Sequence, residues 1–304
     1  MSKTSTLLDR FRGSMIGAVI GDCLGSPVEC MFWHGIPISS ALKHFQKYQE
    51  FPEKIYNYTD DTAMARQVAE SIITMRSIDP NDMSQRFVKE YYNEPERGYG
   101  ANVCDVFKKL KKTDCIEPFK PASEQFNGSG SYGNGAAMRV HPVGLFCYNN
   151  SDQFIIENVQ KSAKITHSHS DAINGAIIQA ACVMWALQGT KPEDLCKKAY
   201  HLSTKFDKPA DKDDLTYTEK MSLVDNYVTK EIFDYEKLIG KLGNDVSAIN
   251  SVPAAIFSFL ASCQTNYIPP GCESTENPFE RSLQLAMSFG GLFDCLSNIH
   301  VNIQ

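Results

Sequence analysis

The chain has 304 residues, with 30 lysines and arginines against 36 aspartates and glutamates, which gives a formal net charge of −6. Hydrophobic residues make up 42% of the chain and charged residues 22%, so the composition excludes a disordered protein and predicts a sizeable core. An acidic balance gives no general attraction to DNA or to anionic lipid, and we expect neither DNA binding nor membrane binding.

Ten cysteines are spread along the chain, and no two of them form a CxxC pair. A chain of this length needs no disulfide staples, so we interpret the cysteines as small buried side chains in a reducing compartment. The N-terminus has no apolar segment followed by a cleavage site, and the longest apolar run, residues 172–187, is shorter than a membrane span. These features predict a soluble intracellular protein.

Helical periodicity recurs along most of the chain. Residues 7–25 repeat apolar side chains at steps of three to five residues, from Leu7 to Leu24, which predicts an apolar helix face. Further helices are predicted over residues 60–77, 81–94, 103–112, 151–167, 171–189, 234–243, 251–264 and 278–291. The polar residues 206–220 predict a loop within one domain. No run alternates as strands do and no repeat is visible, so we predict an all-α protein with a single compact, many-helix domain.

The first candidate site follows the first helix, in "GAVIGDCLGSPVE". Helices commonly end where glycine and proline cluster, so Gly21, Gly25 and Pro27 predict a helix followed by a turn. Such a turn would present Glu29 to a cleft. The alternative is a glycine helix cap followed by a surface glutamate.

The second candidate is "YTDDTAM" at residues 58–64, where Thr59, Asp60, Asp61 and Thr62 stand at the start of a helix. Threonine and aspartate are ordinary N-cap residues, which is one interpretation. Four oxygen-bearing side chains in a row exceed what one cap requires, and hard cations such as Mg²⁺ prefer clustered oxygen ligands. The motif therefore also indicates a metal site.

The third candidate is the glycine-rich stretch over residues 126–140. Its glycines match G-x-G-x-x-G, but no buried strand precedes them, so we reject a dinucleotide-binding fold. A glycine-rich backbone that enters a helix still exposes amide groups to a diphosphate. Phe126 and Tyr132 could stack on a base. The alternative is a flexible loop.

The fourth candidate, "THSHSDAINGA" at residues 166–176, contains His167 and His169. Two histidines at this spacing would need further histidine or cysteine ligands to hold zinc, and none is nearby in the sequence. We therefore do not expect a zinc site.

Taken in this order, the four stretches resemble the ADP-ribosylglycohydrolase family. The matching elements are GxxxGDxxGxxxE at residues 17–29, "YTDDTAM", "GNGAAMR" and "TH" followed by "NGA". The segments "RGYGANVCDVFKKL", "QFNGSGSYGNGAAMRV" and "SVPAAIFSFL" resemble the branch that hydrolyses ADP-ribosyl-serine and poly(ADP-ribose). The resemblance runs from about residue 10 to Gly291. It predicts one domain over residues 1–291 and an atypical tail over residues 292–304.

The resemblance implies an all-helical domain with two Mg²⁺ ions in a cleft. The metal ligands would be Thr59, Asp60 and Asp61, and Glu29 would act beside the ribose as a general acid or base. The residues implied to bind ADP-ribose are Phe126, Gly130, Ser131, Tyr132, Gly133, Asn134, His167 and Val246. The glycosidic bond would break with oxocarbenium-like charge on the ribose.

The chain departs from the family after Gly291. The family places Gly-Gly-Asp-x-Asp-Thr and further helices here, whereas this chain has Leu292 for the first aspartate, Asp294 for the second and Cys295 for the threonine. An alternative splice product or truncated gene model is one explanation, and a diverged pseudoenzyme is another. Because carboxylates from both halves would hold the metal, we expect weakened Mg²⁺ binding and low or absent hydrolysis.

Two functions follow from the resemblance. The first is Mg²⁺-dependent removal of ADP-ribose from proteins, with serine-linked ADP-ribose, poly(ADP-ribose) or O-acetyl-ADP-ribose as substrates. The second is an ADP-ribose-binding form with impaired catalysis. We expect a monomer whose partners are ADP-ribosylated proteins, ADP-ribose and poly(ADP-ribose). The expected location is the cytoplasm and nucleus, with mitochondria as an alternative.

Overall fold

The structure is a computed structural model, and it describes residues 6–29, 55–206, 215–228, 230, 234–264 and 275–289. These ranges contain helices and no β-strand; Gly133 and Ser247 form an isolated bridge. The all-α prediction is therefore confirmed. The elements are α1 (Leu7–Glu29), α3 (Asp60–Met75), α4 (Pro80–Asn93), α5 (Ala101–Lys112), α6 (Lys120–Ser123), the 3₁₀ turns η2 (Gln125–Gly128) and η3 (Asn134–Ala136), α7 (His141–Phe146), α8 (Asp152–Ala163), α9 (Ser170–Leu187), α10 (Pro192–Ser203), α11 (Tyr217–Val228), α12 (Tyr235–Leu242), α13 (Ala248–Gln264) and α14 (Pro278–Ser288).

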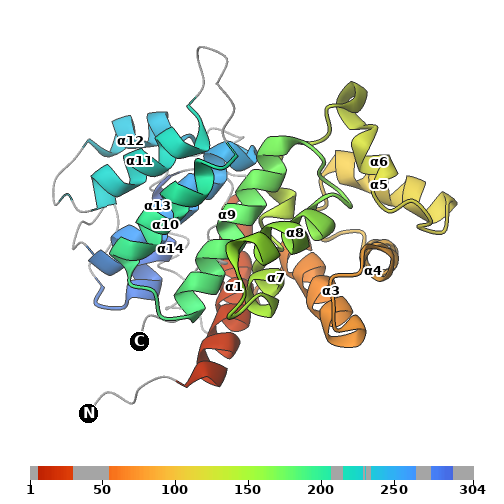
Figure 1. Cartoon of the computed structure of the whole chain (residues 1–304), viewed down its shortest axis with the longest axis horizontal. Coiled ribbons are helices and arrows are strands. Elements are labelled where there is room, and N and C mark those ends of the chain that lie inside the picture. Colours follow the sequence, from red (N-terminus) through yellow and green to blue (C-terminus); the bar gives the residue numbers. More distant parts are fainter. Residues whose placement is uncertain are drawn as a thin grey trace.

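Helix α9 forms the centre of the fold, with α10 to α14 on one side and α3 to α6 on the other (Figure 1). It packs against α7, α8, α10 and α13. Its side chains are buried almost all round, which explains its continuous apolar sequence. By length and composition α9 could cross a membrane, but 83% of it is buried inside the protein, as expected for a core helix.

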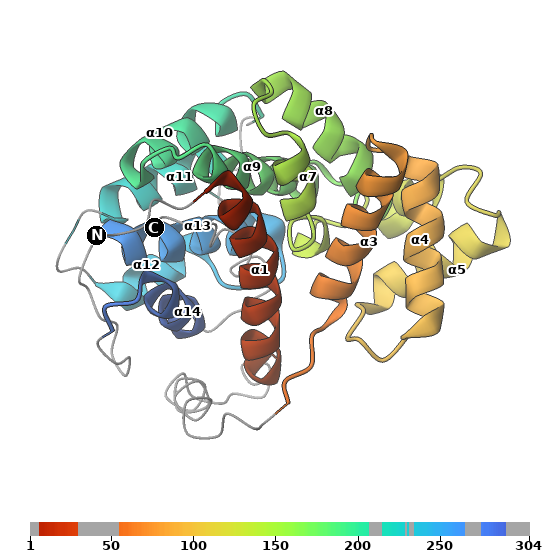
Figure 2. The same ribbon diagram turned by 90° about the horizontal axis from the view of Figure 1, so that it is seen from below.

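Helix α1 lies between α14 and α3 (Figure 2). Its end and the role of its glycines differ from our prediction. The helix does not end at Gly21 or Gly25; it continues to Glu29 with Pro27 in its last turn. Its buried face consists of small or polar residues: Ser14, Gly17, Ala18, Gly21, Asp22 and Gly25. The glycines therefore allow close helix packing and do not cap the helix.

Several large apolar side chains of α1 lie outside this buried face. Ile16, Val19 and Ile20 are exposed, and they line a cleft of about 390 Å³ together with Ile73 of α3. Phe11, Met15 and Leu24 of the predicted apolar face are partly buried against the core, whereas Leu7 and Val19 are exposed, so only part of the predicted face is used for packing. The small residues of α1 add close packing, because they bring two backbones close together.

His141 begins α7 and is buried, and its Nδ1 atom has no hydrogen-bond partner. Burial lowers the pKa of His141 to about 3. Because the pKa of His141 is lower in the folded state than in the unfolded state, its contribution to the unfolding free energy is fully present above the unfolded pKa near 6.5. That contribution is lost as the pH falls toward 3. At about 1.4 kcal/mol per pH unit, this histidine costs about 2 kcal/mol of unfolding free energy between pH 6.5 and 5.

We therefore expect His141→Leu to lose less stability than the wild-type chain between pH 7.5 and 5. Urea unfolding at the two pH values measures the difference. The exposed His201 provides the control, and His201→Leu should leave the acid dependence unchanged. Equal losses of unfolding free energy between pH 7.5 and 5 in the wild-type, His141→Leu and His201→Leu chains would contradict the prediction.

Candidate active site

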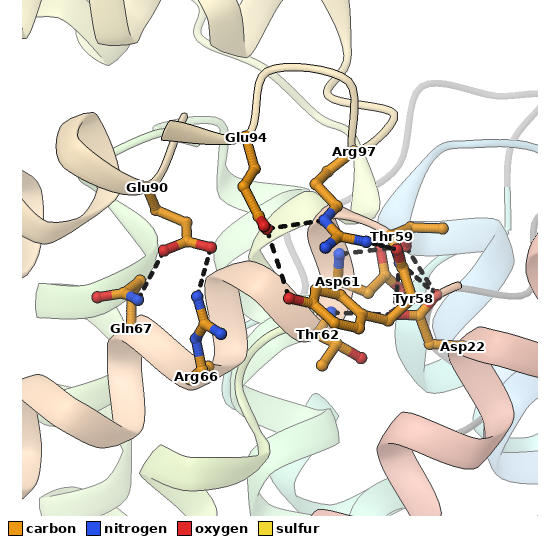
Figure 3. A network of polar contacts seen from close by, with 10 residues as sticks. All are labelled: Asp22, Tyr58, Thr59, Asp61, Thr62, Arg66, Gln67, Glu90, Glu94 and Arg97. Carbon is orange, nitrogen blue, oxygen red and sulfur yellow. Dashed lines mark hydrogen bonds and ion pairs between the residues drawn. The ribbon is translucent and has the colours of Figure 1, made fainter. Parts of the chain in front are cut away.

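The start of α3 is held by α1 (Figure 3). Thr59 is the N-cap residue of α3, and its Oγ1 accepts a hydrogen bond from the Asp61 amide at 3.3 Å. The Asp22 carboxylate accepts hydrogen bonds from the Thr59 amide, the Thr59 hydroxyl and the Thr62 amide. A buried carboxylate of one helix thus satisfies amide groups at the N-terminus of another, where negative charge is also favoured by the helix dipole.

A loop between α4 and α5 holds the same motif from the other side. The Asp60 amide donates to the Arg97 carbonyl at 2.7 Å. The Arg97 guanidinium lies over the Tyr58 ring at 3.8 Å, donates to the Tyr58 carbonyl and pairs with Glu94. Gly98 has φ +91 and lies beside the Asp60 carboxylate, since a Cβ atom there would be 3.6 Å from Asp60 Oδ1. The cation–π contact and the ion pair fix the loop against the motif.

A buried glutamate fixes α3 against α4. Glu90 pairs with Arg66 at 2.7 Å and accepts a hydrogen bond from Gln67 at 2.9 Å (Figure 3). Both partners lie on the second turn of α3, so this contact sets the position of the helix that begins with Asp60 and Asp61.

The glycine-rich loop turns through left-handed backbone conformations. Phe126, Asn127, Gly128 and Gly130 all have positive φ values, between 50° and 91°. Phenylalanine rarely adopts this region, and such strain concentrates at ligand sites. Phe126 and Tyr132 nevertheless keep 44% and 48% of their surfaces exposed, with ring centroids 6.1 Å apart.

This loop packs against two other segments of the chain. A Cβ atom at Gly130 would lie 2.0 Å from Ser168 Oγ and 2.7 Å from the His169 amide nitrogen. The Asn134 amide donates to the Val246 carbonyl at 2.9 Å. The structure therefore brings together the glycine loop, the histidine segment and Val246.

His167 is buried beneath the glycine loop. A Cβ atom at Gly135 would approach its ring to 2.7 Å, so only glycine fits there without displacement of the ring. Burial and the nearby Arg139 lower the pKa of His167 to about 3, which keeps the imidazole neutral. Thr166 Oγ1 lies 2.8 Å from His167 Nδ1 and also accepts a hydrogen bond from Arg139. This arrangement favours a tautomer with the proton on Nε2.

Arg139 is a buried arginine that holds the glycine loop. Its guanidinium is 1% exposed and donates to the carbonyls of Gly135 and Ser162 and to the Thr166 hydroxyl. Burial lowers the pKa of Arg139 to about 9, and the Asp60 carboxylate opposes that shift. The arginine therefore fixes the glycine loop, and its positive charge interacts electrostatically with Asp60.

The remaining predicted residues lie at the limits of the described structure. Glu29 is the last residue of α1, but its side chain is outside the described residues, as are Asp294 and the whole tail from residue 292. In the described part of the chain, no group of three or more histidine, cysteine, aspartate or glutamate residues could hold a metal ion. The metal ligand set and the division at residue 291 stay predictions.

Sequence reasoning assigned no role to three residues that organise the site, namely Asp22, Arg97 and Arg139. All three belong to segments that the family resemblance quoted, at "GDCLG", "RGYG" and "AAMRV". Each of the three is a charged residue within an apolar or glycine-rich segment, where a charged side chain commonly has a specific partner. That pattern is the signal by which the sequence could have indicated them.

Known proteins resemble this chain over most of its length. Residues 3–299 match the model of the ADP-ribosylglycohydrolase family, so the match extends past Gly291. ADP-ribosylhydrolase ARH3 of Homo sapiens is 36% identical, and the alignment covers 96% of this chain and 83% of the human protein. The Xenopus tropicalis protein of that name is 38% identical over 83% of this chain and 75% of its own length.

A solved structure of an ADP-ribosylglycohydrolase-related protein complex matches 97% of this chain and 85% of its own, with a TM-score of 0.63 at 22% identity. That likeness supports the fold. The family match and the relatives above 30% identity together show that the chain belongs to the ADP-ribosylglycohydrolase family.

Proposed function

We propose that this chain removes ADP-ribose from proteins in a Mg²⁺-dependent reaction, with serine-linked ADP-ribose as the first substrate to test. The observation that carries the proposal is the convergence of the glycine loop, His167 and Val246, with Arg139 bound to Gly135 and Thr166 beside them. Poly(ADP-ribose) and O-acetyl-ADP-ribose contain the same ADP-ribose unit and are further substrates. We place these activities in the cytoplasm and nucleus.

The glycine loop has the features needed to bind ADP-ribose. A positive φ value at Gly130 turns the backbone sharply, and backbone amides in such turns bind phosphates. The exposed rings of Phe126 and Tyr132 offer apolar faces on which adenine would stack. A neutral His167 with its proton on Nε2 would donate a hydrogen bond and would add no charge beside the ribose.

Thr59, Asp60 and Asp61 are hard oxygen donors at one helix end, and this donor set fits one side of a Mg²⁺ ion, which commonly keeps several waters and uses one or two carboxylates. When bound, Mg²⁺ would fix the ribose hydroxyls and favour deprotonation of a water molecule. Glu29 would move the proton as general acid or base. Asp22 and Arg97 hold the motif in place.

The second candidate function is ADP-ribose binding without cleavage. One observation favours it: Leu292 stands where the family has an aspartate. In that form the glycine loop would still hold ADP-ribose. Release of ADP-ribose would be slow or absent because the metal lacks ligands.

Calorimetry with ADP-ribose, with and without Mg²⁺, tests the shared part of both functions. We expect ADP-ribose to bind, and more tightly with Mg²⁺. A serine-ADP-ribosylated peptide then separates the two functions, because release of ADP-ribose supports hydrolysis whereas binding without release supports the second function. Absence of ADP-ribose binding under both conditions would contradict both.

A further inference from the structure

We infer that Asp22 is a positioning residue that orients the lone pairs of Thr59 toward a divalent cation. The inference deepens the proposed function, because it rests on the metal role proposed for residues 59–61. It starts from the hydroxyl of Thr59, which has one proton and two acceptor lone pairs.

The Thr59 hydroxyl proton has a defined destination. Thr59 Oγ1 lies 2.8 Å from Asp22 Oδ1, and a carboxylate accepts only, so the threonine donates its proton to Asp22. One lone pair of Oγ1 then receives the Asp61 amide at 3.3 Å. The other lone pair remains for a ligand, and it points away from the proton. A threonine hydroxyl can ligate a cation only through such an oriented lone pair.

The Asp22 carboxylate also fixes the backbone of the motif. Its two oxygens lie 3.0 and 3.1 Å from the Thr59 amide nitrogen, and Oδ2 lies 3.1 Å from the Thr62 amide nitrogen. These bonds come from α1, which is a different element from the helix that they hold (Figure 3). Asp22 is 7% exposed, so water competes little for its oxygens.

Asp22 affects both the stability of the fold and the geometry of the proposed metal ligands. In the described structure its carboxylate forms no ion pair, so its negative charge is balanced by amide and hydroxyl dipoles alone. That charge lies beside the proposed metal ligands and adds to the negative potential there. Residues that orient metal ligands typically contribute about 10- to 100-fold to metal affinity.

The test measures binding of Mn²⁺, which prefers the same oxygen ligands as Mg²⁺ and can be counted as free ion by electron paramagnetic resonance. Asp22→Asn keeps the side-chain shape but places an amide NH₂ or a single oxygen against the Thr59 and Thr62 donors. We expect the Mn²⁺ affinity of the 304-residue chain to fall by about 10-fold or more.

Asp79→Asn is the matched control. Asp79 caps α4 through the same chemistry, with its carboxylate accepting from the Asn81 and Asp82 amides at 2.9 and 3.0 Å. It is not part of the proposed site, so its replacement should change Mn²⁺ affinity by less than about 2-fold, and because asparagine caps a helix about as well as aspartate, it should change stability little. Equal Mn²⁺ affinities in the Asp22 and Asp79 variants would overturn the inference.

A second variant covers the case in which Asp22→Asn does not fold. Asp22→Glu keeps the charge and moves the two oxygens, so we expect the same loss of Mn²⁺ affinity at unchanged net charge; a wild-type affinity would overturn the inference. The hydrolysis assay is read separately. A wild-type chain that binds no Mn²⁺ overturns this inference, whereas Asp22-dependent Mn²⁺ binding without ADP-ribose release sustains it and refutes hydrolysis alone.

Discussion

Replacing Gly130 with alanine is expected to abolish tight binding of ADP-ribose and to lower the unfolding free energy by about 2–4 kcal/mol. Gly130 has φ +77, and an alanine Cβ atom would lie 2.0 Å from Ser168 Oγ and 2.7 Å from the His169 backbone nitrogen. The hydroxyl can rotate away, but the backbone cannot, so the loop must move. Calorimetry with ADP-ribose and urea unfolding measure the two effects.

Gly128 provides a matched control for backbone strain. It has φ +91, but a Cβ atom there would meet nothing within 4 Å. Gly128→Ala should therefore cost only about 1–2 kcal/mol for the left-handed conformation and leave ADP-ribose affinity nearly unchanged. Equal losses of affinity in the two variants would mean that strain alone matters, and would contradict the close packing of the loop on residues 168 and 169.

Arg139→Ala is expected to lower the unfolding free energy by about 3–5 kcal/mol. The substitution removes a fully buried side chain that packs on Phe87, and it leaves the carbonyls of Gly135 and Ser162 and the Thr166 hydroxyl without their donor. Lysine has a single ammonium group, so Arg139→Lys should recover only part of this loss. Urea unfolding without ligand gives the values.

Arg86→Ala is the control for removal of an arginine. Arg86 pairs with Asp82 and Glu70 near the surface of α3 and α4, at 2.7 and 3.6 Å. Such partly exposed pairs contribute about 1 kcal/mol or less. A loss below about 1 kcal/mol in Arg139→Ala, comparable to that in Arg86→Ala, would show that Arg139 does not hold the loop.

Much of the fold could be predicted from periodicity. Helix α9 reads as a long apolar run because it is buried on all sides, and α3 reads as an amphipathic helix that starts at Thr59. Helix α1 ends later than predicted, and only part of its predicted apolar face packs against the core. Apolar periodicity reports where large side chains lie, whereas the most buried residues of α1 are mainly glycine, alanine and serine, which carry little apolar surface.

The candidate site could be predicted in its parts but not in its connections. The glycines, His167 and the aspartates are visible as motifs, and the structure brings Gly130 and Gly135 onto the histidine segment. The role of Asp22 depends on a helix crossing, and that of Arg139 depends on contacts with Gly135, Ser162 and Thr166. Such long-range contacts follow from packing, which no local pattern encodes.

The most direct test of the proposed hydrolase is release of ADP-ribose from a serine-ADP-ribosylated peptide by the 304-residue chain, measured with Mg²⁺ and with a chelator. We predict slow release that requires Mg²⁺, falls to background in Asp60→Asn and Asp61→Asn, and is unchanged in Asp105→Asn, a surface aspartate paired with Lys108. No release by the wild-type chain at any Mg²⁺ concentration, or release that survives both motif substitutions, would contradict it.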